Sequence, residues 1–283
     1  MVERTQTPFE QQLLQSIAQE RTRVQELLEH PQDIEIINVQ TYWAEQNESG
    51  DWVPNIEGRL AIQAIVSLFE QLMQNAQTKD QIVRLPPIVI SGGHEASFGG
   101  TTLSAIYSTA LHQALQQSSI INQTIVVDTK LSQQLDHNSI HILAEHALKK
   151  KVGRRLLAED TRGTLTFLDQ IRETIGFKKA LSIGRLGHLK RIQMLADRNS
   201  VPTEQLSIEG IIAYFQPELL SWLVDSPEAA ETRERILESE RNFDTVEQRN
   251  RQILRIDRQG RGMEALARIL GRAKQLFTHR ERQ

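Results

Sequence analysis

Short apolar runs and longer amphipathic stretches follow one another along the first two thirds of the chain. Apolar residues recur at spacings of three and four, as on one face of a helix, in 9–29, 59–76 and 101–117. Short apolar runs, which are typical of buried strands, occupy 34–39, 88–90 and 124–128. Elements that alternate in this way form parallel sheets with helices on both faces. The pattern therefore predicts an α/β fold, a Rossmann-like, doubly wound, mostly parallel sheet.

The alternation continues further along the chain. It predicts helices over 138–151 and 164–174, strands over 154–159 and 179–183, and a loop with a helix over 184–198. The segment 207–215 forms a strand or a short helix. We expect three regions: an N-terminal helix in 1–30 that packs on the core, the Rossmann-like domain in 31–215, and a helical, arginine-rich C-terminal appendage in 216–283.

Composition narrows the class of protein. The formal net charge is −3, so there is no global reason to expect nucleic acid or an anionic membrane as a partner. Cysteine is absent, which excludes disulfides and thiolate metal sites. No run approaches the roughly 20 apolar residues of a membrane span, and the N-terminus lacks an apolar signal core. We expect a cytoplasmic protein.

A glycine-rich stretch follows the apolar run at 88–90. Ser91, Gly92 and Gly93 come first, a second glycine pair stands at 99–100, and Thr101 opens the next helix. Backbone N–H groups at such a strand–loop–helix junction can point at an anion. The spacing is neither a Walker loop nor a G-x-G-x-x-G fingerprint, and a glycine pair after a strand also serves as a tight turn. The stretch predicts an anion site and leaves the reaction open.

Two later loops also follow predicted strands. The candidate residues there are Glu159, Asp160, Thr161 and Thr164 in the first loop, and Arg185, His188 and Arg191 in the second. The two arginines could hold a phosphate or carboxylate, and the histidine could act as an acid or base near neutral pH. The acidic pair could bind a ribose hydroxyl, orient the histidine, or hold a metal through water. Ligands of doubly wound sheets lie beyond the carboxyl ends of the strands, so all three loops could share one rim.

Each of these features also has a structural interpretation. The threonines can be helix caps, and His188 can be an ordinary surface residue near a helix start. The tryptophans of the polar loop 42–54 can form a ligand lip or simply cover the sheet edge. His137 and His141 share a helical face but His146 does not, so we expect no metal site.

The order of motifs resembles the YdcF/SanA/ElyC-like domain family of unknown function. In that family a strand ends in Ser-Gly-Gly, a later turn carries an acidic residue and opens a helix, and a last strand runs into His-x-x-Arg. The matching segments are Ser91–Gly93, Glu159–Thr164 and His188–Arg191, and Arg59 stands where the family has an arginine opening its first helix. Gly163 stands in place of the family's Asn, and Gly184 and Arg185 replace its Thr-Ser, so the chain would be a divergent member.

The resemblance implies a nucleotide-like or phosphorylated ligand, S-adenosylmethionine being one candidate, and a setting in cell-envelope metabolism. We expect a small anionic ligand to be held by Ser91, Gly92, Gly93, Thr101, Thr161, Thr164, Arg185 and Arg191. If the protein is an enzyme, His188 would be the acid or base and Glu159 its orienting carboxylate. The alternative is a non-catalytic scaffold that binds a protein partner through its helical ends. In the tail, arginines such as Arg251 and Arg255 are interspersed with glutamates, which favours surface ion pairs over a nucleic-acid face.

Overall fold

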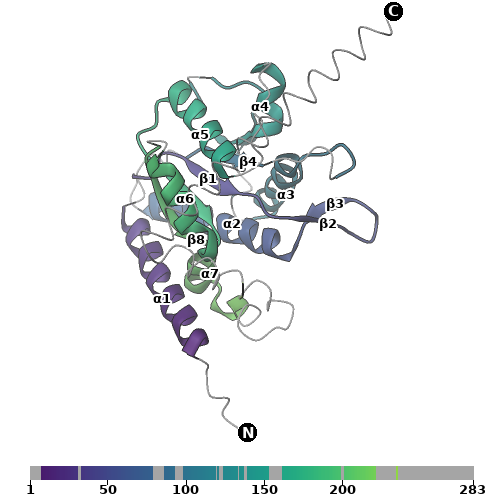
Figure 1. Ribbon diagram of the computed structural model, residues 1–283. Coiled ribbons are helices and arrows are strands. Elements are labelled where there is room, and N and C mark those ends of the chain that lie inside the picture. Colours follow the sequence, from purple (N-terminus) through teal and green to yellow (C-terminus); the bar gives the residue numbers. More distant parts are fainter. Residues whose placement is uncertain are drawn as a thin grey trace, which may run out of the picture.

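A computed structural model gives the fold and describes residues 8–30, 33–78, 86–92, 98–118, 120, 124–132, 134–136, 139–152, 161–198, 201–220 and 234. Helices and strands alternate along these residues (Figure 1). The elements are α1 (Pro8–Glu29), β1 (Ile37–Gln40), β2 (Ala44–Gln46), β3 (Trp52–Pro54), α2 (Ile56–Thr78), β4 (Ile88–Ser91), α3 (Leu103–Gln117), β5 (Thr124–Val127), β6 (Ser139–Ala144), α4 (Glu145–Val152), α5 (Thr161–Ile175), β7 (Ala180–Gly184), α6 (Leu186–Arg198), β8 (Thr203–Ser207), α7 (Ile208–Phe215) and the 3-10 turn η2 (Pro217–Leu219).

Six parallel strands form the central sheet, in the order β5-β6-β4-β1-β7-β8. The chain winds outward from β1 to β4 and β5, returns to insert β6 between them, and then crosses to β7 and β8 on the other side of β1. The direction of winding therefore reverses between β1 and β7. This all-parallel sheet with helices on both faces confirms the predicted Rossmann-like α/β fold.

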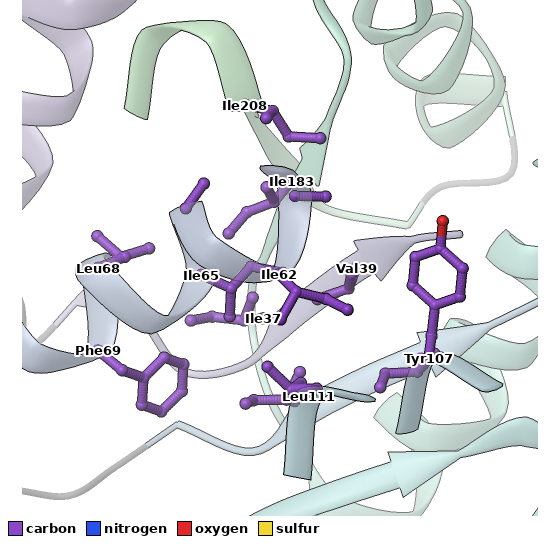
Figure 2. Close-up of a cluster of buried hydrophobic side chains, with 14 of the residues drawn as sticks. Ile37, Val39, Ile62, Ile65, Leu68, Phe69, Tyr107, Leu111, Ile183 and Ile208 are labelled. Atoms are coloured by element: carbon purple, nitrogen blue, oxygen red, sulfur yellow. The ribbon is translucent and has the colours of Figure 1, made fainter. Parts of the chain in front are cut away.

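The two faces of the sheet have separate cores because successive residues of a strand point to opposite faces. On one face Ile37 and Val39 of β1 pack with α2, α3 and α7, as Figure 2 shows for Ile62, Ile65 and Leu111. On the other face, Val89 of β4 and Ala180 of β7 belong to a second cluster with apolar side chains of α5 and α6. Both layers hold the central strands in fixed register, which fixes the positions of the loops that follow them.

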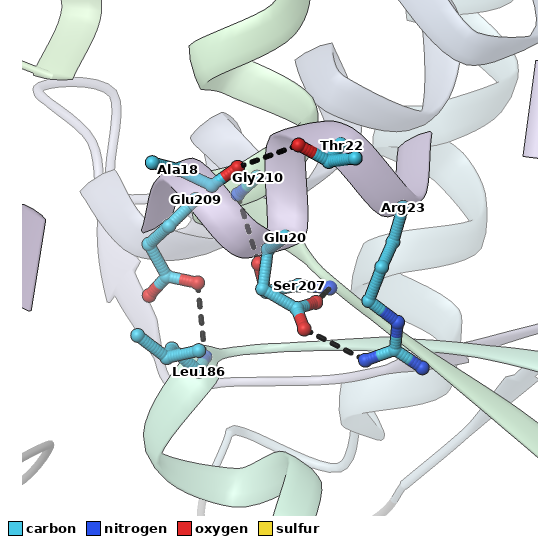
Figure 3. Close-up of polar contacts among 8 residues, drawn as sticks. All are labelled: Ala18, Glu20, Thr22, Arg23, Leu186, Ser207, Glu209 and Gly210. Carbon is cyan, nitrogen blue, oxygen red and sulfur yellow. Dashed lines mark hydrogen bonds and ion pairs between the residues drawn. The ribbon is translucent and has the colours of Figure 1, made fainter. Parts of the chain in front are cut away.

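Helix α1 packs against α7 and the edge strand β8 (Figure 3). The buried Glu20 carboxylate accepts a hydrogen bond from the Ser207 N–H at 3.0 Å and pairs with Arg23 at 2.7 Å. A Cβ added to Gly210 would lie 2.6 Å from the Glu20 Cβ, so the two helices can approach this closely only because position 210 is glycine.

The sequence prediction of one helix over 138–151 is wrong. Residues 139–144 form strand β6, and only the following residues form a helix, α4. The strand is buried along its whole length because it lies between β5 and β4, and a fully buried apolar run does not reveal its period. The predicted strand over 154–159 lies outside the described residues.

Three other segments refine the predictions. The polar loop at 42–54 contains the antiparallel hairpin of β2 and β3. The segment predicted as strand or helix is helix α7, preceded by strand β8. Most of the arginine-rich tail lies outside the described residues, and within them no helix has the length and apolar character needed to cross a membrane.

Candidate functional site

The candidate site lies where the winding reverses, at the carboxyl ends of β1, β4 and β7. Gln40 ends β1 and is level with Ser91, which ends β4. Gly184 ends β7 on the other side of β1, and Arg185 follows it. Because the three strands are parallel and adjacent, Gly92 after β4 and Arg185 between β7 and α6 start from the same edge of the sheet. We call this the carboxyl edge.

Arg185 lies at the centre of a buried ionic cluster. Its side chain is only 8% exposed, and its Nη1 lies 2.7 Å from the Glu57 carboxylate in the first turn of α2. Its Nε lies 3.9 Å from the Glu209 carboxylate in the first turn of α7. The guanidinium predicted to hold an anion is therefore shared by two carboxylates, while its Nη2 has no hydrogen-bond partner among the described residues.

Glu209 connects this cluster to α6. Its carboxylate accepts a hydrogen bond from the Leu186 N–H at 2.9 Å, which satisfies one of the otherwise unpaired donors at the start of that helix (Figure 3). Burial raises the pKa of the Glu209 carboxyl, and the positive charge of Arg185 offsets part of that rise. Protonation of Glu209 would leave Arg185 with a single ionised partner in the cluster.

Tyr42 covers the cluster. The Arg185 guanidinium lies 5.9 Å from the centre of the Tyr42 ring, and the His188 ring lies parallel to that ring at 6.4 Å. The Tyr42 N–H donates to the Tyr107 hydroxyl at 3.0 Å. Burial raises the pKa of both tyrosines, so both hydroxyls stay protonated at neutral pH.

The absence of a side chain at Gly58, in the first turn of α2, leaves space for the Tyr107 hydroxyl. A Cβ added there would lie 2.0 Å from that oxygen. The hydroxyl also lies 3.4 Å from the Trp43 carbonyl oxygen, to which it can donate. One tyrosine of α3 thus holds the chain that leaves β1.

The Ser-Gly-Gly loop also contacts a carboxylate of the chain. The Gly92 N–H donates to Glu145 Oε2 at 2.8 Å, and the Gly92 carbonyl accepts from the Ser104 N–H. Gly92 has φ +139°, and a Cβ there would lie 2.0 Å from Thr41 Oγ1, so glycine is required. The N–H predicted to cradle an anion is therefore already bonded to a negatively charged side chain.

The start of α3 is capped from within. The Thr102 hydroxyl accepts from the Ala105 N–H at 3.1 Å, as expected of a helix N-cap. The Thr101 N–H donates to the Phe98 carbonyl. Ser104 is buried, and its hydroxyl accepts from the His146 N–H. Thr102 is therefore a helix cap, as in the structural interpretation of the sequence, whereas Thr101, the predicted ligand residue, lies one residue before the cap.

Polar side chains lie buried on the α5 and α6 side of the carboxyl edge. Ser91 is 1% exposed, and its Oγ has no hydrogen-bond partner among the described residues. The same holds for Nε2 of Gln40, its neighbour on β1. Gly184 adds no side chain here. An added Cβ would lie 3.4 Å from the Gln40 Cγ, so position 184 is on the same side of the sheet as Gln40. Further down β1, Asn38 donates to the Ser182 hydroxyl at 2.9 Å.

The structure brings some predicted site residues to one edge, and it does not describe the positions of others. Ser91, Gly92 and Arg185 lie at the carboxyl edge, and the exposed His188 and half-buried Arg191 lie on the helix that starts there. Helix α5 begins at Thr161, before the helix start predicted at Thr164, and Thr164 lies in its first turn. Gly93, Glu159 and Asp160 lie outside the described residues, as does His137.

Sequence reasoning missed the three carboxylates that meet these loops, Glu57, Glu145 and Glu209. Each stands within the first two residues of a helix, where acidic side chains are common for other reasons. The signal that could have found Glu145 is the apolar run at 139–144, which as a strand would place it at the carboxyl edge. Among the residues that the structure describes, no group of three or more His, Cys, Asp or Glu side chains could hold a metal ion.

Neither a family model, nor a curated protein, nor a solved structure matches the chain.

Proposed function

We propose that the chain binds a small anionic ligand, nucleotide-like or phosphorylated, at the carboxyl edge between β1, β4 and β7. The observation that carries this proposal is a set of buried polar atoms there that lack hydrogen-bond partners among the described residues: Ser91 Oγ, Gln40 Nε2 and Arg185 Nη2. A buried polar atom left without a partner costs about 1–3 kcal/mol. A ligand that supplies the partners would recover part of that cost.

The chemistry of these atoms indicates what the ligand would offer. Gln40 Nε2 and Arg185 Nη2 are donors only, so their missing partners are acceptor oxygens, and the Ser91 hydroxyl can donate to one as well. Gln40 points to the α6 side of the sheet and Arg185 to the side of Glu57 in α2. A ligand over the strand ends would reach both. Phosphate and carboxylate groups supply several acceptor oxygens at one point.

Positive charge from Arg191 and from two helix N-termini also favours an anion here, beside the carboxylates. Arg191 lies on α6, whose N-terminus begins at the edge, and so does His188. Because only four residues separate the end of α5 from the start of β7, the N-terminus of α5 lies towards the same edge. Helix N-termini carry partial positive charge and can bind an anion. Thr161 and Thr164 belong to the first turn of α5, so we include them in the proposed site. If binding leads to a reaction, His188 is the residue that would transfer a proton.

The alternative is a non-catalytic scaffold that retains the fold, and one observation favours it. Carboxylates of the chain already accept the N–H groups of Gly92 and Leu186, the places where a ligand oxygen would be held. In that case the edge is closed by its own side chains, and no small anion would stabilise the protein.

A thermal-shift screen separates the two functions. Inorganic phosphate, ADP, glucose 6-phosphate and S-adenosylmethionine are tested on the full chain and on Ser91→Ala, His188→Ala and Arg191→Ala. A probe at a hundred times its Kd should raise the melting temperature of the wild type by about 5–10 °C. Ser91→Ala and Arg191→Ala should reduce that shift because they remove contacts to the anion.

Lys179→Ala is the matched control. Lys179 is also a surface cation, but it pairs with Glu204 at the opposite end of β7. Its loss should leave the ligand-induced shift unchanged. If no probe shifts the melting temperature, or if the Lys179 variant loses the shift as fully as the Arg191 variant, the carboxyl edge is not the binding site and the scaffold is the better account.

A further inference from the structure

Two large apolar side chains are exposed in the part of the chain that the structure describes, and they belong to neighbouring segments. Trp43 is 59% exposed and Ile56 is 41% exposed. The Trp43 carbonyl accepts a hydrogen bond from the Asn55 N–H at 3.1 Å, which joins the start of the hairpin to the start of α2. Two exposed apolar side chains on neighbouring segments offer a small apolar surface on which another molecule can pack.

The Trp43 ring is held in place although most of it is exposed. Its backbone is fixed by the Asn55 N–H and by the Tyr107 hydroxyl. Its ring meets the buried ring of Phe98 edge to face, with centres 5.2 Å apart. Phe98 also contacts Trp52, at 5.0 Å. A ring with a fixed orientation loses little conformational freedom when a ligand packs on it.

Trp43 also follows closely in the chain on residues of the proposed anion site. It comes three residues after Gln40, the last residue of β1, and it directly follows Tyr42, which covers Arg185. The hairpin that it opens packs against α3 and α2 (Figure 1). A ligand with a charged group over the strand ends could therefore extend a planar group towards this indole.

We propose that Trp43 is a stacking platform for a heteroaromatic ring, so that the ligand of the carboxyl edge is a nucleotide and not a sugar phosphate. This inference rests on the proposed function, since it extends the same site. Every nucleobase has a flat face that can stack on an indole, and the contribution per base corresponds to about a five- to 150-fold change in Kd. Ile56 would border the ring as an apolar rim.

The test compares two probes on three proteins. The Kd values of ADP and ribose 5-phosphate are measured by calorimetry for the full chain, for Trp43→Ala and for Trp43→Phe. We expect Trp43→Ala to weaken ADP binding about ten-fold or more and to leave ribose 5-phosphate binding unchanged. Trp43→Phe should keep most of the ADP affinity because a phenyl ring still stacks.

Trp52→Phe is the matched control, since Trp52 also contacts Phe98 but is half-buried. It should leave both Kd values unchanged, and the quenching of tryptophan fluorescence by ADP should persist in it and be lost in Trp43→Ala. If both probes bind and Trp43→Ala changes neither Kd, the platform is wrong and the anion site stands. If neither probe binds, the proposed function itself fails.

A protein contact at this patch would give a different result. If Trp43→Ala leaves ADP affinity intact but converts a dimer into a monomer in light scattering, the patch is an interface between two copies of the chain. That outcome also overturns the stacking platform.

Discussion

Glutamates determine the charge of the carboxyl edge. Glu57 and Glu209 flank Arg185, and Glu145 accepts the Gly92 N–H. The edge therefore carries negative charge beside the positive charges of Arg185 and Arg191 before any ligand arrives. An anion that binds there must either meet donors that these carboxylates do not use, or bind together with a proton. Glu209 takes up a proton more readily than an unfolded glutamate does, because burial raises its pKa.

The raised pKa of Glu209 makes a prediction about stability. An unfolded glutamate has a pKa of about 4.3, and the folded protein holds the Glu209 proton to higher pH. Between these two pKa values the folded state binds more protons than the unfolded state. The contribution of Glu209 to the free energy of unfolding is therefore full at low pH and declines as pH rises through that window.

Urea denaturation of the wild type and Glu209→Gln across this pH range measures the effect. The glutamine keeps an acceptor for the Leu186 N–H but does not titrate. We expect the stability of the wild type relative to the variant to fall as pH rises. A difference that stays constant, or that grows with pH, would contradict the assigned burial of this carboxyl.

Gly92 is required for two reasons that can be separated. Its φ of +139° is unfavourable for any other residue, and a Cβ would collide with Thr41 Oγ1. Gly50, in the hairpin turn, has φ +83° but open space around it. Gly50→Ala should therefore cost only the backbone strain, about 1–3 kcal/mol, and Gly92→Ala should cost more.

Chemical denaturation measures the free energy of unfolding of both variants. The double variant Gly92→Ala with Thr41→Ala then removes the collision between the added Cβ and Thr41 Oγ1. The double variant should recover part of the loss, after allowing for the hydrogen bond from Thr41 Oγ1 to the Ser91 carbonyl. Equal costs at positions 50 and 92 would mean that the close approach of Thr41 is not tight.

At the level of elements, the docking of α1 on α7 depends on the absence of a side chain at Gly210. An added Cβ would also lie 2.9 Å from the backbone carbon of Glu20, which cannot move aside as a flexible side chain could. Gly210→Ala should push the helices apart and destabilise the protein by about 1–3 kcal/mol, although alanine is the better helix former.

Glu20 gives the matching pair of variants. Glu20→Gln keeps an acceptor for the Ser207 N–H and should cost little, whereas Glu20→Ala leaves that buried N–H unpaired and should cost about 1–3 kcal/mol. Urea midpoints of these three variants test the contact. If Gly210→Ala is as stable as the wild type, α1 does not pack on α7 at this distance.

Most elements could be predicted from periodicity, and β6 shows where that signal fails. Helices α1, α2 and α3 each present one apolar stripe, so their spacing is visible in the sequence. Strand β6 is buried on both faces, and its residues run directly into α4, so strand and helix merged into one apparent helix. The strand order was also invisible, since it depends on which apolar runs pair in space.

For the whole molecule, the sequence allowed the shared edge of the candidate residues to be predicted but not their contacts. Ser91 and Arg185 both follow strands, and in a parallel sheet such residues share an edge. That Arg185 is paired with Glu57 and Glu209 could not be foreseen, because α2 lies far before β7 in the sequence, and α2, α7 and β7 meet only through the winding of the sheet. The orphaned atoms of Gln40 and Ser91 likewise appear only once β1 and β4 are adjacent.

The central claim is that an anionic ligand lies over the ends of β1, β4 and β7. Backbone amide chemical shifts of the full chain, recorded during a titration with ADP, test it most directly. The predicted result is a set of saturable shifts at residues 40–43, 91–92 and 185–188. Shifts confined to the opposite ends of the strands, at Ile37, Ile88 and Ala180, or no saturable shifts at all, would contradict it.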